Sequence, residues 1–312
     1  MKRIALVKDR NKFWEVYHDI LKKNGYDVQL IDIFNRSEHE QVLSSSFDAF
    51  IWRAKHTPSV RDLARRFIYF FDVERGIPTF PTWKEFWHYD DKIAQYFMFR
   101  EKNIPIPDTY LFFSKDEAMT FADTATYPLV FKCPHGAGSS NVGLLKKKSE
   151  GFKYIKKAFG KGIQTYFKSD IQRGYVLFQE FLENNPGDYR LVCHGQNHIS
   201  GFFRHNMKNA PFASGSGEFD LGDLSEDLLT FTARIHERLD YDIMSYDILK
   251  DNDRNWVVTE MSVIFGDLSH VVYDQAPVYE KTRQGDWHRT DAQENRHVRF
   301  IRHLLKRWNW HE

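Results

Sequence analysis

The sequence predicts an α/β fold in which a parallel-sheet domain at the N-terminus precedes two α+β subdomains. Apolar, strand-like runs alternate with helical spacing over the first 88 residues, which is typical of a parallel sheet with helical crossovers. Further along, two pairs of apolar runs are each joined by a short polar turn, which is typical of antiparallel hairpins. We therefore expect an N-terminal domain over 1–88, a central subdomain over 89–174 and a C-terminal subdomain over 175–312.

The first domain is expected to contain three strands and two helices. Its strands are the apolar runs 3–7, 27–33 and 47–52. Apolar residues at helical spacing follow the first strand, and Asn24-Gly25 ends that helix, while a second helix over 63–76 ends at a glycine. No glycine follows the first strand, so a dinucleotide site is not expected there.

The elements of the other two subdomains follow a break at the prolines of "IPIPDTY". The expected elements are, in order, a helix around 116–121, a strand over 127–133, a Lys-rich helix, a strand over 175–182, a hairpin that turns at 195–197, a helix over 227–240 and a hairpin that turns at 252–254.

The composition indicates a globular chain and excludes several classes of function. Hydrophobic residues make up 42% and charged residues 28% of the 312 residues, a balance typical of folded domains. The formal net charge of +1 argues against nucleic-acid binding, which needs a basic surface. No apolar run is long enough for a membrane span or a signal-peptide core, and two cysteines form neither a disulfide framework nor a metal-ligand pattern. We expect a cytoplasmic protein.

A glycine-rich loop after the strand at 127–133 is a candidate phosphate-binding site. The strand delivers Lys132, and the loop's candidate residues are Gly136, Gly138, Ser139 and Ser140. Such a loop can direct backbone N–H groups toward phosphate oxygens, while a strand lysine binds a nucleotide from the side. The pattern is not a P-loop, because no Gly-Lys-Ser/Thr follows the glycines. An ordinary hairpin connection is the alternative.

Two acidic residues, Asp247 and Glu260, lie on the strands of the second predicted hairpin. Because the turn between these strands is short, the two carboxylates can converge. Paired carboxylates suit Mg²⁺, which prefers oxygen ligands and shares them with phosphates. Two solvated acids on an exposed sheet face are the alternative.

A third group of polar residues begins where the strand at 175–182 ends. In "QEFL", backbone groups would contact the edge of an adenine base and Glu180 would accept from its amino group. Asp188, Arg190 and Arg204 would project from neighbouring strands into one cleft. A surface salt bridge is the alternative for each arginine.

The order of these motifs resembles the ATP-grasp superfamily, especially its ribosomal-protein glutamate ligase and glutathione synthetase branches. The succession is a strand lysine and glycine loop, Gln-Glu-apolar-apolar, Asp-x-Arg, Arg, and finally Asp and Glu, and it covers about residues 1–270. The resemblance implies the ATP-grasp fold, in which two α+β subdomains enclose ATP. It also implies an ADP-forming carbon–nitrogen ligase that uses Mg²⁺, or Mn²⁺ as an alternative, and joins a small-molecule carboxylate to an amine.

The resemblance further implies roles for single residues. "DKIAQYFMFREKNIPIPDTY" resembles the family's entry into the ATP domain and makes Lys92 a nucleotide lysine beside Lys132. The implied ATP-binding residues are Lys92, Lys132, Gly136, Gly138, Ser139, Ser140, Glu180, Phe181, Leu182 and Asp188. The implied metal ligands are Asp247, Glu260 and Ser262, and Arg190 and Arg204 would stabilise negative charge during catalysis.

One position departs from the family pattern. The family has Glu-x-Asn on the metal strand, whereas this chain has Ser262 in place of the asparagine. A hydroxyl can bind Mg²⁺ but reaches less far than an amide oxygen. Three interpretations stay open: a more weakly held second ion, an oxygen supplied by Asp267, or a protein that binds nucleotide without catalysis.

The sequence leaves the substrates open. We expect amide formation through an acylphosphate on a small metabolite, an amino acid or a sugar acid; modification of a peptide or protein, and a non-catalytic nucleotide-binding module, are the alternatives. The basic loop with Arg53 and His56 is a candidate carboxylate site, or a solvated loop. The loop 209–219 is a candidate lid. Whether the chain forms a homodimer is also open.

Two further features allow two interpretations each. Residues 298–308 predict a helix whose apolar face docks on the protein's own core, or whose basic face, with Arg299, Arg302 and Lys306, meets an acidic lipid surface. Aromatic residues make up 16% of the chain, which indicates large cores or exposed rings that bind sugars or bases.

Overall fold

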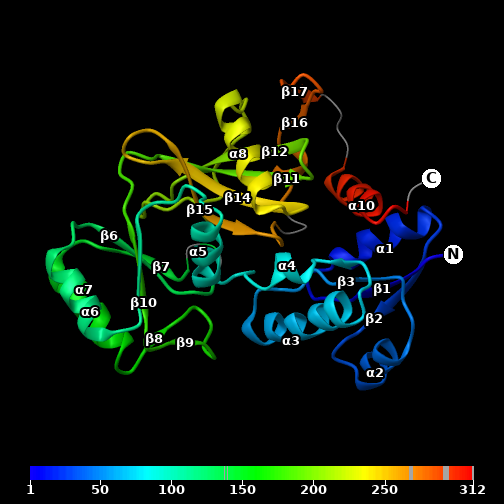
Figure 1. Ribbon diagram of the computed structural model, residues 1–312, viewed down its shortest axis with the longest axis horizontal. Coiled ribbons are helices and arrows are strands. Elements are labelled where there is room, and N and C mark those ends of the chain that lie inside the picture. Colours follow the sequence, from blue (N-terminus) through cyan, green and yellow to red (C-terminus); the bar gives the residue numbers. More distant parts are fainter. Residues whose placement is uncertain (137, 139, 267–269, 291–294, 311–312) are drawn as a thin grey trace.

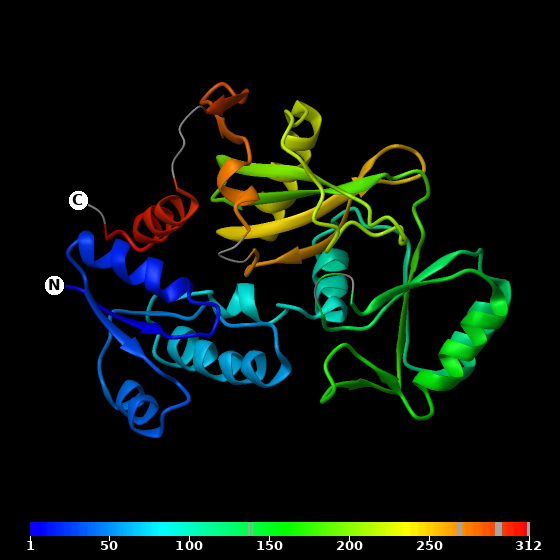
Figure 2. The same ribbon diagram turned by 180° about the vertical axis from the view of Figure 1, so that it is seen from behind.

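The computed structural model describes the chain except residues 137, 139, 267–269, 291–294 and 311–312. The N-terminal domain and the central sheet lie at opposite ends of the molecule, and a larger C-terminal sheet lies above and between them (Figure 1, Figure 2). No helix in the described part of the chain is both long enough and apolar enough to cross a membrane.

The N-terminal domain contains the predicted parallel sheet. Its strands are β1 (Arg3–Val7), β2 (Asp27–Ile31), β3 (Ala49–Ile51) and β4 (Thr79–Phe80), in the order β2-β1-β3-β4 with parallel pairings. Its helices are α1 (Phe13–Lys23), α2 (Arg36–Ser44), α3 (Pro58–Tyr69), the π-helix η1 (Phe70–Glu74) and α4 (Trp83–Phe86). The sequence did not predict α2, because Val42 is its one buried residue and no apolar period marks it.

The central sheet has the order β5-β10-β6-β7. The elements here are α5 (Lys92–Glu101), β5 (Thr109–Phe112), α6 (Lys115–Thr124), β6 (Leu129–Lys132), β7 (Val142–Leu145), α7 (Lys148–Ala158), β8 (Ile163–Gln164), β9 (Ile171–Gln172) and β10 (Val176–Glu180). Strand β10 pairs with β5 and β6 and so lies in this sheet, whereas the sequence placed residues 175–182 in the C-terminal subdomain. Its partner β5, directly after the proline break, was not predicted, whereas its other partner, β6, corresponds to the predicted strand over 127–133.

The C-terminal sheet follows the order β15-β14-β11-β12-β16-β17, with β13 paired to β12. The elements are β11 (Gly187–His194), β12 (His198–His205), β13 (Phe219–Asp220), α8 (Glu226–Leu239), β14 (Ile243–Lys250), β15 (Trp256–Ser262), α9 (Val272–Gln275), β16 (Val278–Lys281), β17 (Trp287–Thr290) and α10 (Arg296–Arg307). Both predicted hairpins are confirmed as β11–β12 and β14–β15. The short β16–β17 hairpin was not predicted, because it has no long apolar run.

Helix α10 packs beside α1 of the N-terminal domain (Figure 1, Figure 2). Phe300 of α10 stacks on Tyr17 of α1 with ring centroids 5.0 Å apart. Ile301, Leu304 and Leu305 are buried. The expected docking of this helix on the protein's own core is therefore confirmed.

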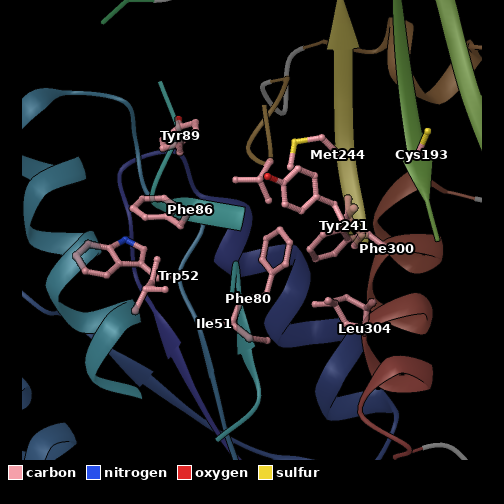
Figure 3. Close-up of a cluster of buried hydrophobic side chains, with 14 of the residues drawn as sticks. Ile51, Trp52, Phe80, Phe86, Tyr89, Cys193, Tyr241, Met244, Phe300 and Leu304 are labelled. Carbon is pink, nitrogen blue, oxygen red and sulfur yellow. The ribbon is translucent and has the colours of Figure 1, made fainter. Parts of the chain in front are cut away.

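The core joins the N-terminal domain, the C-terminal sheet and α10 in one apolar cluster, and Figure 3 shows side chains from all three meeting. The members labelled there are Ile51, Trp52, Phe80, Phe86, Tyr89, Cys193, Tyr241, Met244, Phe300 and Leu304. The central subdomain has a separate core between its sheet and the helices α6 and α7. The largest fully buried side chains are mostly aromatic, so large cores account for much of the aromatic content.

Two buried histidines make the fold sensitive to acid. Burial lowers the pKa of His88 to about 3 and that of His236 to about 4, from 6.5. Both histidines stay neutral in the folded chain, whereas in the unfolded chain they bind protons below pH 6.5. The contribution of each histidine to the stability of the fold is therefore present above pH 6.5 and is lost as the pH falls toward the folded pKa values. From pH 7 to pH 5 we expect the free energy of unfolding to fall by about 2 kcal/mol for each histidine.

Urea unfolding at the two pH values measures this change. In His236→Gln the fall in the free energy of unfolding between the two pH values should be smaller by the contribution of one histidine. An unchanged pH dependence in that variant would contradict the assignment.

Candidate active site

Cross-strand register brings the predicted charged residues onto one face of the C-terminal sheet. Asp188 on β11 lies opposite Arg204 on β12, and Arg190 lies opposite Asp247 on β14. Asp247 in turn lies opposite Glu260 on β15. Directly opposite residues in antiparallel strands point to the same side, and alternate residues of one strand share a side. The row Glu260–Asp247–Arg190 therefore crosses three strands on one face.

Two arginines and two aspartates on this face form a closed network. Arg204 donates to both carboxylate oxygens of Asp188 at 2.7 Å and lies 2.7 Å from Oδ2 of Asp247. Arg190 also binds Asp247, through Nε and through Nη2 at 2.8 Å. Asp247 thus holds both guanidinium groups, and its side chain is almost fully buried.

Burial acts differently on the two aspartates. Burial alone would raise the pKa of Asp247, but Arg190 and Arg204 together lower that pKa to about 2. At Asp188 the effect of burial exceeds that of Arg204, so the pKa is raised. Asp247 is therefore the firmly ionised member that holds the two arginines in place.

The predicted lysines reach this network from the central subdomain. Nζ of Lys92 lies 3.3 Å from Oε1 of Glu260 and donates to the carbonyl of Gly136 at 3.1 Å. Nζ of Lys132 donates to the carbonyl of Thr259 at 3.3 Å. Burial, partly opposed by Glu260, lowers the pKa of Lys132 to about 8. Both lysines therefore lie where the two sheets meet, next to the strand that carries Glu260.

The glycine-rich loop begins at a buried ion pair that the sequence did not reveal. Asp90 accepts from the backbone N–H of Gly136 at 2.8 Å and from Nη1 of Arg61 at 3.1 Å. Gly136 has φ +121°, and a Cβ there would lie 2.4 Å from Nδ2 of Asn141. Glycine is therefore required at 136. Asp90 lies two residues before Lys92, and no motif singled it out.

The candidate lid lies against this loop. A Cβ on Gly215 would be 3.5 Å from the carbonyl oxygen of Gly138, which is ordinary van der Waals contact. Ser140 is described, whereas the predicted Ser139 lies outside the described residues. The loop 209–219 and the phosphate loop thus meet, and lid closure stays a prediction.

In the strand that leads to the predicted adenine site, Glu180 and Lys132 lie on opposite faces of the central sheet. Phe178 packs on Phe121 of α6, so the alternation of β10 directs Gln179 toward the face that carries Lys132. Gln179 donates to Oγ1 of Thr109 at 2.9 Å and lines a cavity of about 20 Å³ with Lys92 and Lys132.

The Glu180 carboxylate accepts instead from Nδ2 of Asn252 at 2.7 Å. Glu180 and Phe181 line a larger cavity of about 580 Å³, while Leu182 is buried. Side chains alternate along the strand "VLFQE", and this alternation is the sequence feature that could have identified Gln179 as the residue on the face of Lys132.

Ser262 lies on the same face as Glu260, two residues further along β15. Its hydroxyl donates to the carbonyl of Ile264 at 2.5 Å. Within the described residues, no three His, Cys, Asp or Glu side chains gather as metal ligands. Asp267, the alternative ligand, lies outside the described residues.

The two candidate substrate residues point to different places. Arg53 is buried among Phe13 and Tyr17 of α1, and its Nη2 donates to the carbonyls of Phe265 and Gly266. The ring of His56 lies 5.6 Å from that of Phe167 in the central subdomain. Arg53 and His56 therefore do not share one solvated loop.

Comparisons with known proteins agree with this arrangement. No family model matches the chain. The α-aminoadipate–LysW ligase LysX of Saccharolobus solfataricus is 24% identical over 247 residues, 77% of this chain and 84% of the relative. The glutamate–LysW ligase ArgX of Sulfurisphaera tokodaii is 25% identical over 175 residues, 55% of this chain and 59% of the relative.

A solved structure gives the fold. The ATP-grasp ligase PsnB, in complex with minimal precursor, Mg and ADP, superposes with a TM-score of 0.61 at 14% identity, over 98% of both chains. The chain has the ATP-grasp fold. The predicted ATP-grasp fold is confirmed, and these relatives support the predicted activity of an ADP-forming carbon–nitrogen ligase.

Proposed function

We propose that this ATP-grasp protein forms an amide bond between a small-molecule carboxylate and an amine, one of them an amino acid, at the expense of ATP. The observation that carries this proposal is the row Glu260–Asp247–Arg190, which Lys92 of α5 and Lys132 of β6 approach. Phosphoryl transfer depends chiefly on positioning and on neutralising charge. This face offers both, because its arginines come from β11 and β12 and its lysines from α5 and β6.

In the proposed reaction, a substrate carboxylate attacks the γ-phosphate of ATP, and an amine then displaces phosphate from the acylphosphate. Lys92 and Lys132 bind the phosphates. Arg190 and Arg204 stabilise the negative charge that develops on the reacting oxygens. Asp188 is a positioning residue in this scheme, since its carboxylate orients Arg204 by two hydrogen bonds of 2.7 Å.

Glu260 and Asp247, together with the nearby Ser262, fit Mg²⁺ by their donor chemistry, since this ion prefers oxygen ligands. Glu260, Asp247 and Ser262 would hold it. When bound, the ion supplies positive charge to the phosphate oxygens. Mn²⁺ and a cytoplasmic location remain predictions.

A phosphate-release assay with ATP and Mg²⁺ tests the proposal. Amino acids are added singly and then in pairs with other amines and acids. We expect release that requires both an acid and an amine, with an amide product detected by mass spectrometry. Release without any amide product, or none with any pair, would contradict the proposal.

A peptide acceptor is the second candidate function. The neighbour PsnB was also solved with the precursor peptide PsnA2, and the relatives LysX and ArgX are named as LysW ligases. The same assay with acidic peptides in place of free acids distinguishes this candidate.

A further inference from the structure

A buried series of contacts runs from the N-terminal domain through Asp90 to the glycine-rich loop. Asp90 lies between α4 and α5, where the chain leaves the N-terminal domain (Figure 1). Its Oδ2 accepts from Nη1 of Arg61 on α3 at 3.1 Å, and its Oδ1 accepts from the backbone N–H of Gly136 at 2.8 Å. The side chains of Arg61 and Asp90 are only 3% and 5% exposed. One buried carboxylate therefore joins the domain to the loop, with a different oxygen for each.

Arg61 fixes the conformation of Asp90 as well as its charge. Its Nη1 also donates to the backbone carbonyl of Asp90 at 3.4 Å. Asp90 has φ +51°, a left-handed conformation that Asp and Asn adopt more readily than most other residues. Because desolvation offsets much of the attraction within a buried ion pair, such a pair contributes little net stability. What the Arg61–Asp90 pair supplies is a single orientation of the carboxylate toward Gly136.

The backbone of Gly136 is held from two sides. Its N–H donates to Asp90, and its carbonyl accepts from Nζ of Lys92 at 3.1 Å. The backbone N–H of Lys92 in turn donates to the carbonyl of Pro134 at 3.0 Å. Nζ of Lys92 lies 3.3 Å from the carboxylate of Glu260. The start of the loop is therefore fixed to the start of α5, beside the candidate metal ligand.

Gln95 fixes α5 to the strand that carries Glu260. Its Nε2 donates to the carbonyl of Met261 at 2.9 Å, and its Oε1 accepts from the N–H of Met261 at 3.2 Å. Gln95 is 2% exposed, so these two hydrogen bonds are shielded from water. Met261 directly follows Glu260 on β15. Residues 90–95 thus set the separation between the glycine-rich loop and Glu260.

We propose that Asp90 is a positioning residue for nucleotide binding. It holds the glycine-rich loop, before ATP binds, at the distance from Glu260 that the phosphates and their metal ion require. This inference rests on the proposed function, because it assigns a role at the same site. Through Arg61, the N-terminal domain contributes to the nucleotide site.

Hydrogen exchange of the Gly136 amide, followed by NMR on the full chain without nucleotide, tests the contact itself. Asp90→Asn keeps the shape of the side chain, but Gly136 and Arg61 must then compete for one acceptor oxygen. We expect exchange to become about 10- to 100-fold faster, the range for a lost hydrogen bond to a charged group. Asp91→Asn removes the same charge from the next residue and keeps a side chain that caps α5, so exchange should be unchanged.

Nucleotide titration separates a positioning role from general destabilisation. In Asp90→Asn the affinity for ATP with Mg²⁺ should fall by about 10-fold, while the affinity for adenosine, which has no phosphates, should stay unchanged. An equal loss for both ligands would indicate a merely structural role and would overturn the proposal.

Unchanged exchange at Gly136 in Asp90→Asn, in a protein whose wild type binds ATP, overturns this inference and leaves the proposed function intact. A wild type that binds neither ATP nor ADP overturns both. If Asp90→Asn does not fold, Arg61→Lys decides the outcome. That variant keeps the positive charge but loses the guanidinium that holds Asp90, so exchange at Gly136 should again be faster, and unchanged exchange overturns the proposal.

Discussion

Arg204→Ala is expected to lower turnover by ~10²–10³-fold while the affinity for ADP changes little. Arg204 binds Asp188 and Asp247 on the sheet face, and neither partner is a residue to which we assign the nucleotide phosphates. Its positive charge therefore acts on the reacting oxygens rather than on the bound nucleotide. Steady-state kinetics and ADP titration measure the two effects separately.

The same substitution should also destabilise the fold by ~3–5 kcal/mol, because it leaves a buried carboxylate without its partner. The double variant Arg204→Ala/Asp188→Asn provides the control. It removes the carboxylate that loses two hydrogen bonds, so stability should recover in part while turnover does not. An equal loss of turnover and of ADP affinity in the single variant would contradict the role of Arg204.

Glu260→Gln is expected to abolish the Mg²⁺-dependent part of ADP stabilisation. In the wild type, MgADP at a hundred times its dissociation constant should stabilise the fold by ~2.7 kcal/mol, which raises the melting temperature by several degrees. Glu260 faces the site with its carboxylate 3.3 Å from Nζ of Lys92. A neutral amide weakens both the binding of a cation and the ion pair with this lysine.

Thermal unfolding with ADP, with and without Mg²⁺, measures this effect. Glu237→Gln, on the exposed side of α8, carries the same change of charge away from the site and should behave as the wild type. A full Mg²⁺-dependent shift in Glu260→Gln would exclude Glu260 as a metal ligand.

Local features of this fold follow from the sequence, whereas long-range features do not. The two hairpins were predictable because short polar turns at 195–197 and 252–254 join apolar runs, and the chain can pair such strands locally. The pairing of Asp247 with Glu260 follows from that turn. Helix α10 was predictable from its apolar period, and so was its docking on the core.

Features that depend on distant parts of the chain were not predictable in the same way. From the sequence, strand β10 was predicted to begin the C-terminal subdomain. Only its hydrogen bonds to β5 and β6 place it in the central sheet. That Glu180 contacts adenine stays a prediction; the packing of Phe178 on α6 places Gln179 on the face of Lys132, which the sequence analysis did not single out. The buried pair of Asp90 and Arg61 has no sequence pattern, because its members come from separate elements.

By itself, the sequence determined the parallel-sheet character of the first domain, the hairpin that aligns the two acidic residues and the succession of motifs typical of an ATP-grasp chain. These depend on residue periodicity and on turns of a few residues. Only the tertiary structure decided that Lys92 meets Glu260, that Asp247 holds two arginines, and that Arg61 pairs with Asp90. Each of these contacts joins residues far apart along the chain, and their distances are set by how the sheets and helices pack.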